Sequence, residues 1–428
     1  MKQILKSMVA GILALFARAI IRKYKPYVVM ITGSVGKTST KDAVHAVLAS
    51  STFVRASEKS YNSEFGVPLT IIGAKNPWNN PIAWLRVFHE ATLLLCTKNH
   101  FPKTLVLEVG ADRPGDLKNI LKIATPDAVV VTKLPEVPVH VEAYASPSAV
   151  RDEEFLPAYA LKSGSPLILS SDDPYAREMA SRIQAKVTTY GTAPDADVRL
   201  SEPHIRFIED TPVGMEATLT IKGKSYPLQV NGALGIPQLY APSAAFALAY
   251  ELSMSEEDIL KGVASYVSPA GRGRVLRGIN NSVLIDDTYN ASPAAVVEAL
   301  NNLSFIPNRR RVAILGDMLE LGRFSIEEHE KIGVLAKEKA DVLVTVGVRS
   351  RETCTASKKA GMEEAVTHCF DSTKDALKGI RDLVGEGDVI LIKGSQSIRM
   401  EHIVETLLEN PDDSQYLVRQ DTEWKSIK

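Results

Sequence analysis

The sequence predicts an α/β protein in which a short N-terminal helix precedes two domains with doubly wound parallel sheets. Short β-branched runs alternate with helix-compatible stretches along most of the chain. A glycine-rich segment joins the first of these runs to a helix, as is typical of ligand-binding turns in such folds. A stretch rich in glycine and arginine divides the alternation in two. We therefore expect a helix over residues 1–27, a central domain over 28–268 and a C-terminal domain over 269–428.

The composition is that of an ordinary globular chain. Of its 428 residues, 45% are apolar and 24% are charged, and the formal net charge is −1. A chain so close to neutral has no overall field that attracts nucleic acid, so we expect no nucleic-acid partner. The cysteines Cys96, Cys354 and Cys369 form no Cys-x-x-Cys pattern. We interpret them as unpaired in a reducing compartment and expect no zinc site.

The central domain is predicted to hold four buried parallel strands, because its apolar runs lack polar alternation. They lie at residues 28–32, 104–109, 128–132 and 166–170, with crossover helices at 38–50, 114–123, 148–163 and 173–185. Alternating residues around a Lys-Gly turn predict an antiparallel hairpin over 216–230. Helices are expected at 242–251 and 255–265, before a linker at 268–274.

The C-terminal domain repeats the alternation and is predicted to be Rossmann-like. Its strands are expected at residues 283–286, 311–315, 342–346 and 388–392, and its helices at 293–303, 326–339, 373–383 and 400–408. The polar tail after Asn410 is expected to be frayed.

The segment Gly33-Ser-Val-Gly36-Lys37-Thr38 is predicted to bind phosphate. Glycines allow the backbone to wrap a polyphosphate, a lysine adds charge and the next hydroxyl can reach Mg²⁺. The alternative is a chance glycine turn, but a strand precedes the segment and a helix follows it. The central domain is thus predicted to be a P-loop ATPase domain that binds ATP and Mg²⁺. Its expected nucleotide contacts are Gly33, Ser34, Gly36, Lys37, Thr38 and Ser39.

The N-terminal segment is mostly apolar from Ile4 to Ile21, but its uncharged core of 11 residues is too short to cross a membrane. Basic residues follow it. Two interpretations remain open: an amphipathic helix packed on the first domain or on a partner, or a helix that lies on the inner membrane surface through residues 1–25. A signal peptide is rejected, because the phosphate loop follows directly and needs cytosolic ATP.

Two further side chains of the central domain follow predicted strands. Glu108 ends the second strand, where a carboxylate at the sheet's C-terminal edge could hold Mg²⁺. His140 follows the third strand and could complete a second metal site. The alternatives are a solvent-facing glutamate and an ordinary loop histidine.

Polar residues also follow three strands of the C-terminal domain. Asn290 could read adenine through its amide, and Asp317 could bind a ribose hydroxyl. Lys393 and Ser395 lie in a turn suited to an anion. Each signal is weak alone, since a polar turn before a helix would look the same. Together they place polar groups where α/β domains bind ligands.

These residues also carry a resemblance to a known family. The matching segments begin at Gly33, Asn62, Glu108, His140, Gly273, Asp286, Leu315 and Lys393 and include Asp286-Asp-Thr-Tyr-Asn290-Ala-Ser-Pro. In this order they resemble the Mur ligases, over residues 28–408. The resemblance implies ATP-dependent amide-bond formation through an acyl phosphate. The type most similar adds D-Ala-D-Ala to a UDP-muramoyl-tripeptide in peptidoglycan precursor synthesis.

The resemblance also implies roles for individual residues. Lys37 would be catalytic with Glu108 and His140, and Thr38, Glu108 and His140 would hold Mg²⁺. Arg274, Asn290 and Asp317 would hold the phosphate, adenine and ribose of ATP across the domain gap. Asn62, Lys393 and Ser395 would face the substrates.

The chain departs from the family pattern at three places. Only about 27 residues precede the central domain, where the family has a domain for the UDP-sugar. A carbamylated lysine is usual about thirteen residues after the histidine, where Glu153 stands here as a possible metal ligand. The usual histidine and asparagine of the Gly-x-His…Asn segment are missing near Pro237, so ATP contacts could shift to Gln238.

Two alternatives to this reaction follow from the departures. One is a related ligase with a different acceptor, for example a lipid-linked one. The other is a nucleotide-binding scaffold at the membrane that has lost catalysis. In every case we expect small-molecule ligands, a monomer and a cytoplasmic location, which could be the inner face of the membrane.

Overall fold

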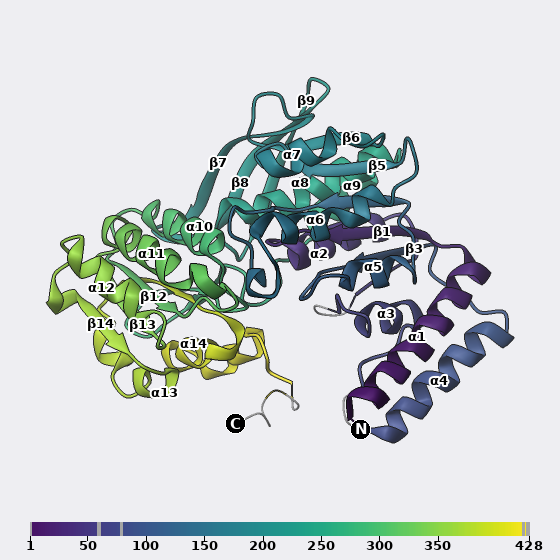
Figure 1. The fold of residues 1–428 in the computed structure, drawn as a ribbon. Helices are drawn as coiled ribbons and strands as arrows, with labels where there is room; N and C mark the ends of the chain where they lie inside the picture. The colour runs from purple at the N-terminus through teal and green to yellow at the C-terminus, as the bar shows by residue number, and fades with distance from the viewer. Residues whose placement is uncertain (1, 58–60, 78–79, 422–423, 425–428) are drawn as a thin grey trace.

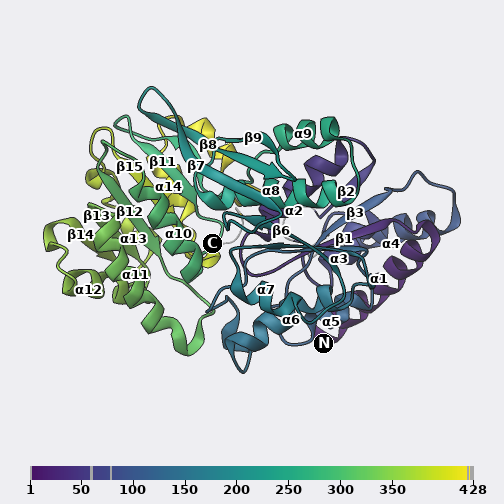
Figure 2. The ribbon, with the colours of Figure 1, turned by 90° about the horizontal axis from the view of Figure 1, so that it is seen from above.

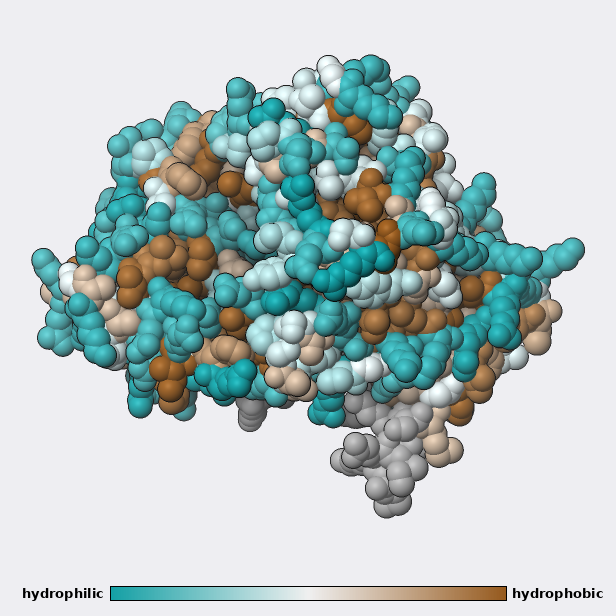
Figure 3. Space-filling view, turned by 45° about the horizontal axis from the view of Figure 1, so that its top comes forward, coloured by the Kyte–Doolittle hydropathy of each residue, from teal (hydrophilic) through white to brown (hydrophobic). Residues whose placement is uncertain are grey.

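Two α/β regions and a helical flank make up the computed structural model of the chain (Figures 1 and 2). The structure describes all residues except 1, 58–60, 78–79, 422–423 and 425–428, and it describes residues 2–7 without their side chains. The C-terminal region and the helix α1 (Lys2–Tyr24) lie at opposite ends of the molecule in Figure 1. The face of the molecule shown in Figure 3 is mostly hydrophilic, with separate hydrophobic patches.

The central region is built on a nine-stranded sheet in the order β2-β3-β1-β4-β5-β6-β7-β8-β9. Its strands are β1 (Tyr27–Thr32), β2 (Val54–Ala56), β3 (Thr104–Glu108), β4 (Ala128–Val131), β5 (Pro166–Ser170), β6 (Lys186–Gly191), β7 (Val198–Ile208), β8 (Thr211–Ile221) and β9 (Lys224–Asn231). Strands β2, β3, β1, β4, β5 and β6 pair in parallel in this order, and β6 also pairs with β7 in parallel. Strands β7, β8 and β9 pair in antiparallel fashion. The predicted doubly wound sheet and its hairpin are confirmed.

Alternate residues of β1 explain why helices cover both faces of this sheet. Val29 and Ile31 face one hydrophobic core, and Val28 and Met30 face the other. The helices are α2 (Lys37–Ala49), α3 (Gly66–Ile72), α4 (Pro81–Cys96), α5 (Asp116–Leu121), α6 (Pro147–Tyr159), α7 (Pro174–Ala180), α8 (Ile236–Glu251) and α9 (Glu256–Ser265).

The C-terminal region holds a six-stranded sheet in the order β10-β11-β15-β12-β13-β14. Its strands are β10 (Arg274–Arg277), β11 (Val283–Asp287), β12 (Arg311–Gly316), β13 (Val342–Val346), β14 (Thr367–Phe370) and β15 (Val389–Lys393). All pairs are parallel except β10 with β11. The helices are α10 (Pro293–Ser304), α11 (Ser325–Lys339), α12 (Arg351–Lys359), α13 (Thr373–Ala376) and α14 (Glu401–Leu407).

Helix α1 packs on the first domain, as the first interpretation of the N-terminus predicts. Leu13, Ala17 and Ile20 are fully buried in the core that α3 and α4 also enter. Within the described residues, no helix combines the length and the apolar character needed to cross a bilayer.

Three predictions about the C-terminal region are wrong. The first part of the tail is ordered: a short 3-10 helix (η6, Pro411–Tyr416) is followed by buried Leu417 and Val418, whereas residues 422–423 and 425–428 lie outside the described residues. The helix expected at 373–383 is broken, because α13 ends at Ala376 and a 3-10 turn follows. Cys354 and Cys369 are paired in a disulfide, because α12 and β14 lie side by side.

Candidate active site between the two domains

The predicted phosphate loop connects β1 to α2 in a conformation that glycine makes possible. Gly33 and Gly36 have φ angles of 114° and 90°. A side chain at Gly33 would also collide with Thr132, since an added Cβ would lie 2.3 Å from its Oγ1. Helix α2 begins at Lys37, and no side chain caps its N-terminus. Its first backbone N–H groups and its dipole therefore suit an anion.

Lys37 lies over this loop and faces a buried glutamate. Its Nζ donates a hydrogen bond to the Gly33 carbonyl and lies 3.9 Å from Oε1 of Glu154. Oε2 of Glu154 accepts a hydrogen bond from the Ser34 hydroxyl. Burial raises the pKa of Glu154, and the charge of Lys37 and the Ser34 hydrogen bond oppose this rise. Glu154 thus supports both the lysine and the loop.

The side chain of Glu153, predicted as a possible metal ligand, lies at the start of α5 instead of facing Lys37. Its Oε1 accepts hydrogen bonds from the backbone N–H groups of Gly115, at 3.1 Å, and Leu117, at 3.0 Å, at the start of α5. Neighbouring residues of a helix point about 100° apart. Since Glu153 and Glu154 both lie on α6, a count of positions from His140 that is off by one selects the wrong carboxylate.

Glu108 lies beside the loop as predicted. It is 2% exposed, and its Oε1 accepts a hydrogen bond from the Thr38 hydroxyl at 3.2 Å. Its Oε2 is buried without a hydrogen-bond partner in the described part of the chain. Burial raises the pKa of Glu108, while the charges of Lys41, Lys37 and Arg272 lower it. An unsatisfied oxygen next to a hydroxyl suits a hard cation such as Mg²⁺.

His140 bridges the two domains instead of joining this carboxylate in a metal cluster. Its Nδ1 lies 2.9 Å from Glu320 of the C-terminal domain, and its Nε2 lies 3.5 Å from Asp112. Burial lowers the pKa of His140, but the hydrogen bond and charge of Glu320 outweigh it and the net pKa is raised. No three His, Cys, Asp or Glu side chains gather around a possible metal position among the described residues. The predicted site of Glu108, His140 and Glu153 is thus not assembled.

Asn62 is brought to the lysine of the loop, as a substrate-side residue should be. Its carbonyl accepts a hydrogen bond from the Gly110 N–H at 3.2 Å. A Cβ added at Gly110 would lie 3.0 Å from Nδ2 of Asn62 and 3.4 Å from Cε of Lys37. The glycine therefore permits the close approach of the amide and the lysine.

Arg272, and not the predicted Arg274, is the arginine whose charge acts on the carboxylate beside the phosphate loop. The guanidinium of Arg274 stacks on Tyr416, 4.7 Å from the ring centroid. Arg272 lies 4.1 Å from the ring of Tyr289, and its charge acts on both Glu108 and Lys393. The Gly-Arg-Gly-Arg segment contains both arginines, and only the fold distinguishes them.

Gln238, where the sequence departs from the family, holds the backbone of Arg272. Its Nε2 donates to the Arg272 carbonyl at 2.8 Å, and its Oε1 accepts from the Ser268 hydroxyl at 2.8 Å. These two bonds occupy the amide, so Gln238 positions the arginine rather than reaching for ATP.

Three of the predicted C-terminal ligand residues are buried in contacts that hold loops together. Asp317 accepts a hydrogen bond from the Ser350 N–H at 2.7 Å. Lys393 is 2% exposed and donates to Asp287 and to the Asn290 carbonyl at 2.7 and 3.0 Å. Ser395 accepts from the Leu319 N–H at 2.9 Å. The predictions that Asp317 binds ribose and that Lys393 and Ser395 face substrate are not supported by these positions.

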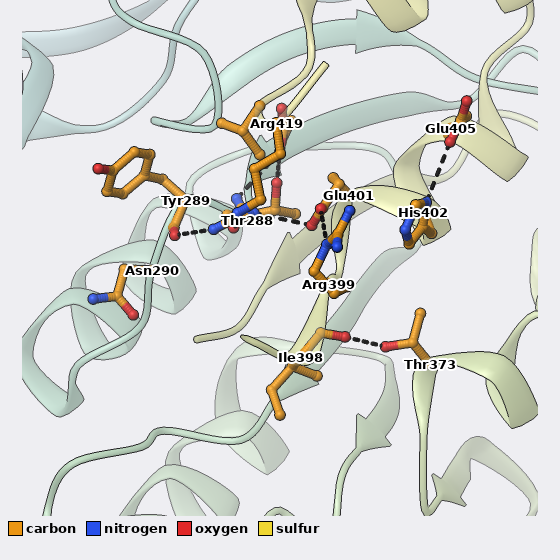
Figure 4. Close-up of polar contacts among 12 residues, drawn as sticks. Thr288, Tyr289, Asn290, Thr373, Ile398, Arg399, Glu401, His402, Glu405 and Arg419 are labelled. Carbon is orange, nitrogen blue, oxygen red and sulfur yellow. Dashed lines mark hydrogen bonds and ion pairs between the residues drawn. The ribbon is translucent and has the colours of Figure 1, made fainter. Parts of the chain in front are cut away.

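Asn290 keeps a half-buried amide at the end of the same loop. Its Oδ1 accepts a hydrogen bond from the Ala291 N–H at 2.9 Å. Its side chain points away from the polar cluster around Arg419 (Figure 4). Lys393 donates a hydrogen bond to the Asn290 carbonyl, which holds the backbone where the sequence predicts the adenine contact.

Sequence reasoning missed Glu154 and Arg272, and it gave Gln238 a contact with ATP instead of a supporting role. Glu154 and Arg272 each stand close to the residue that was chosen instead, Glu153 and Arg274. A signal was present in both cases, a second candidate of the same type, but no rule of spacing selects between them.

A phosphate loop that faces a second α/β domain defines a two-domain nucleotide-binding protein. Comparison with known proteins narrows this class. Residues 31–249 match the family described as "Mur ligase middle domain", and residues 271–396 match "Mur ligase, glutamate ligase domain". The chain therefore belongs to the Mur ligase family and is an ATP-dependent ligase.

Individual relatives agree with this assignment. The chain is 28% identical over 398 residues to UDP-N-acetylmuramoyl-tripeptide–D-alanyl-D-alanine ligase of Bacillus subtilis, covering 92% of this chain and 79% of that one. It is similar to the crystal structure of MurF ligase from Thermotoga maritima in complex with ADP, with a TM-score of 0.75 and 25% identity, covering 93% and 83% of the two chains. MurF from Acinetobacter baumannii has the same fold, with a TM-score of 0.77, 23% identity and coverage of 94% and 81%.

Proposed function

We propose that this ligase joins D-Ala-D-Ala to UDP-N-acetylmuramoyl-tripeptide in peptidoglycan precursor synthesis. The observation that supports the ligase chemistry is the uncapped start of α2 beside Lys37 and the buried carboxylate of Glu108. The choice of substrates is supported by the 28% identity to UDP-N-acetylmuramoyl-tripeptide–D-alanyl-D-alanine ligase of Bacillus subtilis.

The reaction that we propose has two steps. A carboxylate oxygen of the tripeptide attacks the terminal phosphorus of ATP, and ADP leaves. The amine of D-Ala-D-Ala then attacks the acyl phosphate carbon, inorganic phosphate leaves and the amine loses a proton. Lys37, Arg272 and the N–H groups of α2 stabilise the negative charge that develops on the phosphate oxygens.

Thr38 and Glu108 would hold Mg²⁺ in this site, since Oε2 of Glu108 is buried without another partner in the described residues. A bound Mg²⁺ supplies charge neutralisation at the phosphates. In place of a carbamylated lysine, Glu154 supplies a permanent carboxylate, which acts through Lys37 and Ser34.

The direct test is phosphate release from ATP on addition of UDP-muramoyl-tripeptide and D-Ala-D-Ala, with the product identified by mass. We expect the mass of the joined pentapeptide product, and loss of turnover by orders of magnitude in Lys37→Ala with the fold retained. A product only with another acceptor would replace the substrate assignment. Tight ATP binding without phosphate release for any acceptor would favour a nucleotide-binding scaffold.

We further propose that the chain acts as a monomer in the cytoplasm and contacts the inner face of the membrane through residues 1–25. Exposed Arg22 in the last turn of α1 and exposed Lys25 just after it support this contact, because cations favour anionic headgroups. Sedimentation velocity of the purified chain tests the monomer.

A further inference from the structure

Helices α1 and α4 form a single unit on the flank of the central domain. They lie side by side, away from the C-terminal domain, in both ribbon views (Figures 1 and 2). Lys23 donates hydrogen bonds to the carbonyls of Leu94 and Leu95 at 2.8 and 3.0 Å, and the Tyr24 hydroxyl donates to Leu94 at 2.7 Å. The end of α1 therefore caps the end of α4, and these hydrogen bonds hold the two helices together.

Each of these helices is apolar on two faces. The inner faces, with Leu13 and Ala17 in α1 and Val87 and Ala91 in α4, belong to the core. The outer faces carry Met8, Ile12 and Leu15 in α1 and Ile82, Leu85 and Leu93 in α4, which are 41–75% exposed. Among the described residues, six of the sixteen exposed large apolar side chains lie on this pair. A helix with a second apolar face is typical of one that also contacts something outside its own domain.

The same flank is strongly basic. Residues 1–25 and 81–103 contain nine lysines and arginines but one acidic residue, Glu90, in a chain with 50 basic and 51 acidic residues. Arg22 and Arg86 are exposed beside the apolar faces. Apolar side chains flanked by cations are typical of helices that lie in the interface of an anionic bilayer.

We propose that the α1–α4 pair docks on an anionic phospholipid bilayer, with its six outer apolar side chains at the boundary of headgroups and acyl chains. A second copy of this chain is a poorer occupant, because two flanks of equal positive charge repel each other. The proposal extends the contact proposed for residues 1–25 to a second helix. The test of this docking proposal needs no catalytic turnover, so the proposal fails or succeeds independently of the ligase assignment.

Co-sedimentation of the full chain with vesicles tests the proposal. We expect binding to vesicles of phosphatidylcholine with phosphatidylglycerol, little binding to phosphatidylcholine alone, and weaker binding at high salt. The double variant Leu15→Gln with Leu85→Gln should lower the vesicle affinity by about tenfold or more. Arg22→Gln with Arg86→Gln should lower it by about twentyfold, since each cation near the surface contributes about fivefold.

The matched control is Ile326→Gln with Val348→Gln, because these side chains are similarly exposed but lie in the C-terminal domain. We expect it to bind vesicles like the unmodified chain, and every variant to keep its thermal unfolding transition. Equal binding by all variants, or no binding to anionic vesicles, would overturn the proposal. Self-association that is lost in the leucine variant without any vesicle binding would assign the surface to a second copy instead.

Discussion

Residues of the same type that lie one or two positions apart have different roles at two places in the candidate site. Glu153 caps α5 while Glu154 faces Lys37, and Arg274 stacks on Tyr416 while the charge of Arg272 acts on the carboxylate beside the phosphate loop. In each pair the backbone direction, and not the chemistry of the side chain, selects the functional member. The pairs therefore supply matched variants.

The Glu154→Gln variant should separate the two glutamates. It keeps the size and a hydrogen-bond partner for Ser34 but removes the charge opposite Lys37, so we expect kcat to fall by about 10- to 100-fold. Glu153→Gln should leave kcat nearly unchanged and lower the free energy of unfolding by about 1 kcal/mol, because it weakens the start of α5. Steady-state phosphate release and denaturant unfolding measure both effects. Added bicarbonate should change neither kcat nor the free energy of unfolding. A requirement of turnover for bicarbonate would mean that a carbamylated lysine takes part.

Asp286 gives a prediction for pH. Burial raises the pKa of Asp286 to about 6, against hydrogen bonds from Thr288 that lower it, and its Oδ2 has no hydrogen-bond partner among the described residues. A carboxyl group whose folded pKa is raised loses stability as the pH rises from its unfolded pKa to its folded one. Asn can keep the bonds from Thr288 through its Oδ1 without carrying charge.

We therefore expect Asp286→Asn to gain stability over the unmodified chain between about pH 4 and pH 6, with a plateau of up to about 3 kcal/mol above pH 6. Denaturant unfolding of both proteins across this range measures the difference. A difference that does not change with pH would show that Asp286 ionises in the folded protein as readily as in the unfolded one.

At the scale of elements, the C-terminal tail acts as a strap on the loop after β11. Arg419 donates hydrogen bonds to the carbonyls of Thr288 and Tyr289 at 3.2 and 2.6 Å (Figure 4). It also pairs with buried Glu401 at 2.9 Å. The same loop carries Asn290, which the sequence predicts to contact adenine. The tail, which its polar composition predicts to be frayed, thus helps to set the shape of the predicted nucleotide site.

Removing this strap should weaken ATP binding more than catalysis. We expect Arg419→Ala to raise KM for ATP several-fold with a smaller change in kcat, because the loop shifts while Lys37 and Glu108 stay in place. Gln420→Ala is the control, since among the described residues its side chain bonds to its near neighbour Val418 and to no part of this loop. Equal effects of the two variants on KM would mean that the tail does not position the loop.

At the scale of the whole molecule, polar bridges connect the two domains. Lys133 pairs with Glu298 at 3.0 Å, and His140 pairs with Glu320 at 2.9 Å. Both pairs are partly exposed, so each adds little to stability. Weak contacts of this kind allow two domains to close around a ligand and open again.

If ATP lies between the domains, its binding should slow amide hydrogen exchange in the phosphate loop and in residues 286–290 together. Mass spectrometry with a non-hydrolysable ATP analogue measures both segments. Lys37→Ala should weaken both effects in parallel. Protection confined to the phosphate loop would remove the C-terminal domain from the nucleotide site.

Local patterns in the sequence were sufficient for the two parallel sheets, the phosphate loop and the carboxylate Glu108. These features depend on hydrophobic runs and on glycine positions, which act over a few residues. These patterns predict where β3 ends and where α2 begins. They therefore also predict that Thr38 and Glu108 lie close together at the carboxyl edge of the sheet.

Only the tertiary structure decided which glutamate and which arginine of two nearby candidates enters the site. It also decided the packing of the tail, the pairing of Cys354 with Cys369 and the outer face of α4. Each depends on contacts between segments far apart in the chain. Lys393 is the clearest case. Its position at the end of a strand predicts that it binds a ligand, but its ammonium group forms an ion pair with Asp287 on the neighbouring strand. Burial in a low-dielectric interior makes such a partner necessary, and a single sequence does not reveal which residue supplies it.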